Sequence, residues 1–119
     1  MAQRLLVVVL NTPLENAAAP LAQAAVAAAM GTTTEVVFTG DSGVIAVAGA
    51  AAGESAGDGT DRSLHDLIHD AAQAGVVFRM CSPAVARFGD DLIAEIREVV
   101  GAAWLVSRVM DPETVTLTY

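Results

Sequence analysis

Residues 4–10, RLLVVVL, form an unbroken apolar run that is rich in β-branched valine. Such a run is typical of a strand buried on both faces, whereas a strand with one wet face alternates apolar and polar residues. Similar apolar segments recur along the chain, separated by stretches with helical spacing. Strands that alternate with helices of ten or more residues predict βαβ units around a mainly parallel sheet, with helices on both faces.

A helix is expected directly after this strand, within residues 12–31. Thr12 is a candidate N-cap, Pro13 suits the first helical position, and Glu15 follows at the third. Pro20 lies inside the segment, where proline either kinks a helix or marks a later start.

The same reasoning assigns helices, strands and loops to the rest of the chain. Ser63 and Asp66 have the spacing of a capping box, with Asp in place of Glu, and predict a helix that starts at Ser63. Residues 49–61 combine small and acidic residues without periodicity and are interpreted as a mobile surface loop. Further strands are expected over residues 34–40 and 76–80, and the last segment, residues 111–119, is expected to form a turn at Asp111-Pro112 and then a strand.

Residues 83–110 have helical spacing and are predicted to form two or three helices, with breaks at Gly89-Asp90 and near Gly101. In this interpretation Asp90 and Asp91 are the acidic opening of a helix with the sequence DLIAEIREVV. Trp104 is expected in the core or in a subunit interface. The predicted fold is one α/β domain spanning residues 1–119, a three-layer α/β/α sandwich with about five strands, flavodoxin-like in outline.

Composition excludes several classes of partner and mechanism. The net charge of −8 argues against nucleic acids and anionic membrane surfaces, and no apolar run is long enough to span a membrane. All six cationic side chains are arginines, so a phosphoacceptor domain that needs lysine is ruled out. The N-terminal run is interpreted as a strand rather than a signal peptide. A single cysteine precludes an internal disulfide and fits a reducing cytoplasm.

Ligands of open α/β sheets bind beyond the carboxyl ends of the strands. This rule selects a small set of candidate residues in the chain, which directly follow predicted strands: Asn11, Thr12, Gly40, Asp41, Cys81 and Ser82.

Cys81 has two open interpretations. A helix predicted to begin at Ser82-Pro83 places the thiol beside backbone N–H groups that favour the thiolate, and Arg79 shares its side of the strand. Arg87, one helical turn further on, is a second candidate cation. Alternatively, free cysteine is often a small buried hydrophobe. With no second cysteine, only one-thiol chemistry remains, in which the sulfur carries a group or reacts with a partner's thiol.

Other motifs do not support a metal or cofactor. His65 and His69 are spaced i, i+4, but they fall on a polar flank of their helix and no third ligand is evident, so no metal is predicted. The sequence GDSG at residues 40–43 lacks the lysine and spacing of a phosphate loop, and no Gly-x-Ser-x-Gly motif is present. No cofactor is expected, and a flavin- or nucleotide-binding domain is the weakest alternative.

Residues 75–89, GVVFRMCSPAVARFG, resemble the DsrE/DsrF-like (DsrEFH/TusD-type) sulfur-relay family. The family pattern is matched at Gly75, Val76, Phe78, Cys81, Arg87 and Gly89. The segments VVFTGDSGVIAV (residues 36–47) and DPETVTLTY (residues 111–119) resemble the family as well, so the likeness spans nearly the whole chain. Ser82-Pro83 is stiffer than the family's small-residue run, and residues 49–61 have no clear counterpart.

The resemblance implies an α/β sandwich assembled as a trimer or hexamer, or together with sister subunits of the family. It further implies a sulfurtransferase-type carrier in which Cys81 accepts sulfane sulfur as a persulfide from a donor protein and passes it to an acceptor protein. The supporting residues expected around this thiol are Ser82, Arg87, Asn11, Thr12, Gly40 and Asp41. The alternative is a non-enzymatic oligomeric binding protein in which Cys81 is structural.

Overall fold

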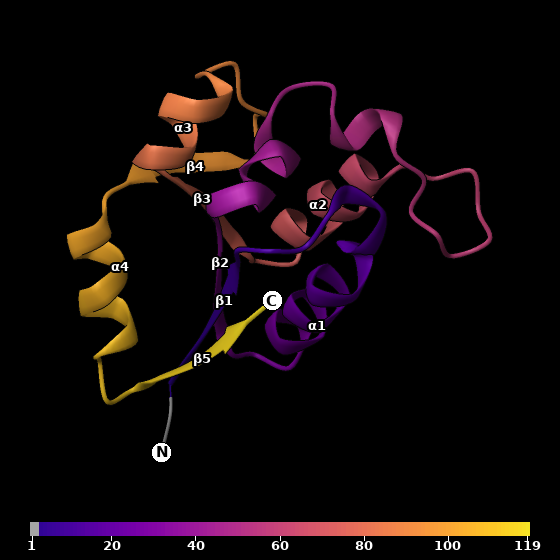
Figure 1. Ribbon diagram of the computed structural model, residues 1–119. Helices are drawn as coiled ribbons and strands as arrows, with labels where there is room; N and C mark the ends of the chain where they lie inside the picture. The colour runs from indigo at the N-terminus through magenta and orange to yellow at the C-terminus, as the bar shows by residue number, and fades with distance from the viewer. Residues whose placement is uncertain (1–2) are drawn as a thin grey trace.

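The computed structural model describes residues 3–119 and has a five-stranded sheet at its centre (Figure 1). All neighbouring strands are parallel, in the order β4-β3-β2-β1-β5. The strands are β1 (Arg4–Val9), β2 (Thr33–Phe38), β3 (Val77–Cys81), β4 (Ile96–Val100) and β5 (Thr114–Thr118). The α/β prediction and the count of five strands are therefore confirmed. Residues 1–2, which the predicted domain includes, lie outside the described part of the chain.

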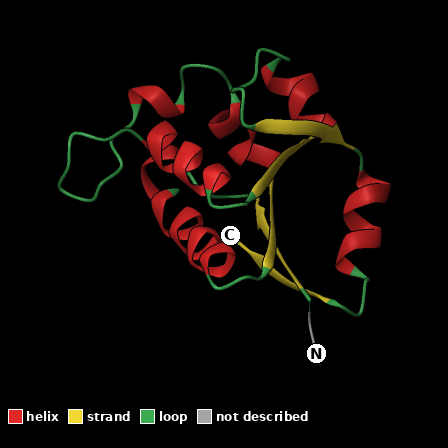
Figure 2. Ribbon diagram, turned by 180° about the vertical axis from the view of Figure 1, so that it is seen from behind, coloured by secondary structure: helices red, strands yellow, loops and turns green. Residues whose placement is uncertain are grey.

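Helices cover the two faces of the sheet unequally (Figures 1 and 2). One face is covered by α1 (Ala18–Ala29) and α2 (Leu64–Gln73), with the 3-10 helix η2 (Gly40–Ala46) beside α3 (Ser82–Phe88) at its upper end. The other face is covered by α4 (Ala102–Val109), which stands alone there in the described chain. The result is a three-layer sandwich with one thick and one thin helical layer.

The larger core lies between the sheet and the α1/α2 layer. Val7, Val36 and Phe78 of the central strands are fully buried there against Leu21 of α1 and Ile68 of α2. Because side chains alternate along a strand, the remaining positions of the same strands point to the opposite face. That face has a smaller apolar cluster of four buried residues, namely Leu6, Val8, Val37 and Cys81.

Two helix starts illustrate how local sequence acts. Ser63 and Asp66 form both bonds of a capping box, with the Asp66 amide donating to Ser63 Oγ at 3.1 Å and the Ser63 amide donating to Asp66 Oδ2 at 2.9 Å, as predicted. The predicted N-cap at Thr12 is wrong. A 3-10 turn, η1 (Leu14–Asn16), comes first, and α1 starts late enough to place Pro20 in its first turn, where a missing N–H costs nothing.

The predicted helix DLIAEIREVV is also wrong, because its second half is strand β4. The outer edge of β3 would otherwise leave its backbone N–H and C=O groups unpaired, and β4 pairs with it from Ile96 opposite Phe78 to Val100 opposite Cys81. The apolar residues of this segment have helical spacing, so the pairing with β3 outweighs the local pattern. Asp90 and Asp91 consequently open no helix.

The segment predicted as a mobile loop, residues 49–61, contains a short 3-10 helix, η3 (Ala51–Gly53). The loop that follows is closed at its neck by the Ala56 amide, which donates to the Arg62 carbonyl at 2.9 Å, and by the Leu64 amide, which donates to the Glu54 carbonyl at 2.8 Å. Its tip extends away from the rest of the molecule in Figure 1. Within residues 3–119, no helix is both long and apolar enough to cross a membrane.

Gly40, the first residue of η2, occupies a position where a side chain does not fit. Its φ of +53° lies in the left-handed region, and a Cβ there would lie 2.7 Å from Leu10 Cδ1 and 2.9 Å from the Leu10 carbonyl oxygen. Gly31 also has a positive φ, +87°, but a Cβ there would meet nothing within 4 Å.

We predict that Gly40→Ala lowers the free energy of unfolding by about 2–4 kcal/mol, because strain and a backbone clash add together. The matched control Gly31→Ala should lose only about 1 kcal/mol, from backbone strain alone. Chemical denaturation of both variants measures the difference. Equal losses would show that the contact with Leu10 is unimportant.

Candidate functional site

Cys81 is the last residue of β3 and the N-cap of α3, so the helix begins at Ser82, one residue earlier than the predicted start. Its side chain points to the α4 face, where it packs with Leu6, Val8 and Val37 and is 3% exposed. Ser82 and Pro83 are exposed directly beside it. The thiol therefore lies at the carboxyl edge of the sheet, as predicted, but it is buried in an apolar cluster on which Trp104 and Leu105 of α4 pack.

The other predicted site residues gather around a different hollow at the same edge of the sheet. Asn11, Thr12 and Asp41 line a space of about 520 Å³ together with Leu14 and Val44. The Thr12 amide donates to Ser42 Oγ at 2.7 Å, which joins the end of β1 to η2. Gly40 precedes Asp41, and the Asp41 carboxylate is paired with the Arg87 guanidinium.

The structure separates this hollow from Cys81. Leu14 and Val44 belong to the core on the α1/α2 face, whereas Cys81 belongs to the cluster on the α4 face. Arg87 does not turn toward the thiol, since its guanidinium lies over the Phe88 ring at 4.7 Å and pairs with Asp41. Arg79 shares the side of Cys81, as the strand alternation predicts.

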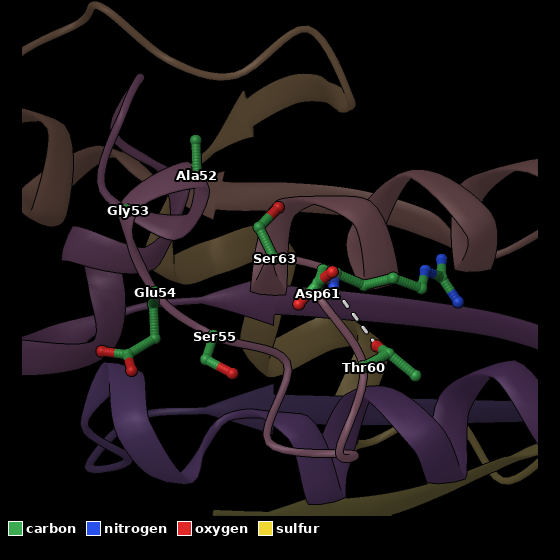
Figure 3. A pocket seen from close by; sticks show the side chains of 8 residues that line it. Ala52, Gly53, Glu54, Ser55, Thr60, Asp61 and Ser63 are labelled. Carbon is green, nitrogen blue, oxygen red and sulfur yellow. Dashed lines mark hydrogen bonds between the residues drawn. The ribbon is translucent and has the colours of Figure 1, made fainter.

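A second hollow, of about 340 Å³, lies inside the loop of residues 52–63 (Figure 3). Glu54 and Ser55 line it from the first half of the loop, and Thr60 lines it from the second half. Thr60 Oγ1 accepts a hydrogen bond from the Arg62 amide at 3.2 Å. None of the predicted site residues lines this hollow. Its lining includes hydroxyl and carboxylate side chains but no cysteine.

The sheet face next to Cys81 contains a buried ionic network that the sequence analysis missed. The Glu35 side chain is 4% exposed and faces three arginines. Arg79 donates to Glu35 Oε2, and Arg108 NH2 donates to the same oxygen at 3.0 Å. The Nε atoms of Arg4 and Arg108 lie 3.0 and 2.8 Å from Oε1, as ion pairs outside hydrogen-bond geometry.

Trp104 joins this network to α4. Its ring lies between two guanidinium groups, those of Arg79 and Arg108, each 4.8 Å from the ring centroid. Cations over an indole face are attracted by its quadrupole. The signal in the sequence was one charge on each of β1, β2 and β3 (Arg4, Glu35 and Arg79), at positions that point to the same face. A charge inside a buried strand requires a partner.

A second missed residue is Glu95, which lies between the two histidines of α2. His65 Nε2 lies 2.8 Å from Glu95 Oε1, and His69 Nδ1 lies 3.0 Å from Oε2. Burial alone would raise the pKa of the Glu95 carboxyl, but hydrogen bonds with His65 and His69 outweigh it and hold the pKa below its usual value. Within residues 3–119, no group of three or more His, Cys, Asp or Glu side chains is arranged to hold a metal ion.

The parallel α/β architecture agrees with a comparison of the chain with protein-family models. The model of the DsrE/DsrF-like family matches residues 3–105, from the start of the described chain into α4. The chain belongs to this family. A search among curated proteins found no match. Every predicted site residue lies within the part that matches the DsrE/DsrF-like model, and β5 lies beyond it.

We predict that Glu35→Gln lowers the free energy of unfolding by about 3 kcal/mol, because it leaves three arginines facing a neutral amide in a buried place. Glu98→Gln is the matched control. Glu98 accepts from Arg79 Nε at 2.6 Å, but its side chain is 50% exposed. This control should lose no more than about 1 kcal/mol. Chemical denaturation checks both values, and a loss for Glu98→Gln as large as that for Glu35→Gln would contradict the argument.

We predict that Glu95→Gln weakens the protein by about 1 kcal/mol near neutral pH. Because the pKa of Glu95 is lowered in the folded state, the carboxylate stabilises the fold above its unfolded pKa, and this contribution is lost as the pH falls through the folded pKa. The stabilities of the variant and the parent protein should therefore converge at acidic pH, below about 4. Urea denaturation between pH 3 and 7 measures this.

The control for this experiment is Glu113→Gln, which removes an exposed carboxylate. Its stability should follow that of the parent protein at every pH. A difference between Glu95→Gln and the parent that is constant over the pH range would exclude the charge of Glu95 as the cause.

Proposed function

We propose that the protein is a sulfur carrier, which accepts sulfane sulfur as a persulfide on Cys81 and passes it to a partner protein. The observation that carries this proposal is the position of the chain's single cysteine in a member of the DsrE/DsrF-like family, at the carboxyl end of a central parallel strand. Ligands of open α/β sheets bind at this edge.

The proposed chemistry moves one sulfur atom without net oxidation. The Cys81 thiolate attacks the outer sulfur of a donor protein's persulfide, a bond forms between Sγ and that sulfur, and the donor's S–S bond breaks to release the donor thiolate. The proton on the outer sulfur moves with it. In the second step an acceptor thiolate attacks the same sulfur, and Cys81 leaves as a thiolate.

The exposed residues at the same edge form the proposed contact surface for donor and acceptor proteins. Ser82 is exposed beside Cys81, and the Asp41–Arg87 ion pair offers both a negative and a positive group to a partner. Asn11 and Thr12 line the 520 Å³ hollow at this edge together with Asp41, and Gly40 directly precedes Asp41. A reducing compartment such as the cytoplasm suits the proposal, because a free thiol must persist there.

Subunit association is part of the proposal, as a trimer or hexamer or with sister subunits of the family. Apolar side chains on the outer surface of α1 support it, since Val26 is 58% exposed and Met30, which directly follows the helix, is 79% exposed. Exposed apolar patches often mark protein–protein contacts.

A second candidate function is favoured by one observation, the burial of Cys81. In this alternative the protein is a non-enzymatic oligomeric binding protein, and the thiol fills the apolar cluster with Leu6, Val8 and Val37. Free cysteine commonly plays this part. The two functions differ in whether sulfur reaches Cys81 at all.

We predict that the protein gains the mass of one sulfur atom per chain when incubated with inorganic polysulfide, and that Cys81→Ser gains none, because Cys81 is the only thiol. Native mass spectrometry measures the sulfur and counts the subunits in one spectrum. Release of the sulfur by a reducing thiol identifies it as a persulfide. If the folded protein remains unmodified while the same chain is modified in denaturant, the structural alternative holds.

A further inference from the structure

The thiol of Cys81 lies beneath α4. Trp104 and Leu105 of this helix pack on the apolar cluster to which Cys81 belongs, and the cysteine is 3% exposed. Any reaction that joins a second sulfur to Sγ needs an approach to that atom. In this arrangement the approach from the α4 face is closed.

The attachment of α4 to the sheet is slight. None of its residues is buried, and its inward side is formed by Trp104, Leu105 and Arg108. Arg108 is the ionic link, through its contacts with Glu35. Figures 1 and 2 show α4 on its face of the sheet without a helical neighbour in the described chain. Elements with few buried contacts are those that open locally, below the cost of global unfolding.

The two ends of α4 are held differently. At its N-terminus Gly101 provides no side-chain cap, and a Cβ built there would meet nothing within 4 Å. Beyond its C-terminus Asp111 is fixed, because its Oδ2 accepts from Arg4 NH1 at 3.0 Å and its Oδ1 accepts from the Glu113 amide at 2.9 Å. Gly101 alone separates the helix from Val100, the last residue of β4, which is buried and pairs with Cys81. The helix is therefore tethered at both ends, and opening tilts its inward face away from the sheet while both ends stay attached. Trp104 and Leu105 lie in the half of the helix next to Gly101.

We propose that α4 is a lid over Cys81, which opens locally while its two ends stay joined to β4 and β5, and thereby controls access to the thiol. Opening withdraws Trp104 from between Arg79 and Arg108 and exposes the apolar strip around Cys81. The identity of the molecule admitted, a partner protein bearing a persulfide or a thiol, rests on the proposed function. The control of access rests on the geometry alone. It also reconciles the reactivity proposed for Cys81 with the burial of its thiol.

The test is the rate at which Cys81 reacts with dithiobis(nitrobenzoate) in the folded full-length chain. The thiolate attacks the aromatic disulfide, forms a mixed disulfide and releases one coloured thiolate, and no other thiol contributes because the chain has one cysteine. Trp104→Ala removes the main inward side chain of the lid and should raise the rate about tenfold or more. The control Val106→Ala truncates an exposed residue of the same helix and should leave the rate unchanged.

A second variant and a second measurement test the lid even if Trp104→Ala fails to fold. Arg108→Gln cuts the link to Glu35 but keeps Trp104, and it should raise the labelling rate as well, by a smaller factor. In the unaltered protein, amide hydrogen exchange in α4 should be faster than in β3, because lid opening leaves the sheet intact. The lid proposal would be contradicted if Trp104→Ala and Arg108→Gln were both labelled at the parental rate. It would also be contradicted if amide hydrogens exchanged at equal rates in α4 and β3.

The lid and the sulfur-carrier function fail in different ways. If Trp104→Ala is labelled faster but no form of the protein takes up sulfur, the lid proposal stands and the sulfur-carrier proposal fails. If the unaltered protein takes up sulfur but both variants are labelled at the parental rate, the sulfur-carrier proposal stands and the lid proposal fails.

Discussion

The ionic network around Glu35 is the interaction on which the thin side of this protein depends. A carboxylate on a buried sheet position is costly unless it is neutralised. Arg4 from β1, Arg79 from β3 and Arg108 from α4 all converge on it. Glu35 therefore joins neighbouring strands to α4, which lies over this face. Without it, three cations would face one another next to the apolar cluster that contains Cys81.

Because the two helical layers are unequal, the two faces of the sheet are packed differently. On the α1/α2 face, large aliphatic and aromatic side chains pack closely, and Phe38 and Phe78 stack with ring centroids 5.9 Å apart. That face supplies most of the buried apolar surface. On the α4 face four apolar side chains share the space with ion pairs and one indole ring. A nucleophile placed on the first face would be sealed in, whereas one on the second can be uncovered by moving a single short helix.

Much of the fold could be predicted from particular residues. The valine run of β1 indicated a parallel sheet, and Ser63 with Asp66 fixed the start of α2 through a capping box. The fourth strand could not be predicted, because residues 91–100 have helical spacing and become a strand only by pairing with β3. The candidate site was predicted in part. Cys81 lies at the predicted edge, but Arg87 pairs with Asp41 rather than facing the thiol.

The sequence by itself determined the class of fold, the family and the one atom available for thiol chemistry, because these follow from local apolar runs, short motifs and a count of cysteines. The tertiary structure alone decided which groups surround that atom. Glu35 and Arg108 are 73 positions apart, and Trp104, from a different element, packs on the apolar cluster that contains Cys81. Such contacts depend on how strands order themselves in a sheet and on which face a helix covers. In residues 75–89 taken alone, nothing reveals that the cysteine lies beneath a helix.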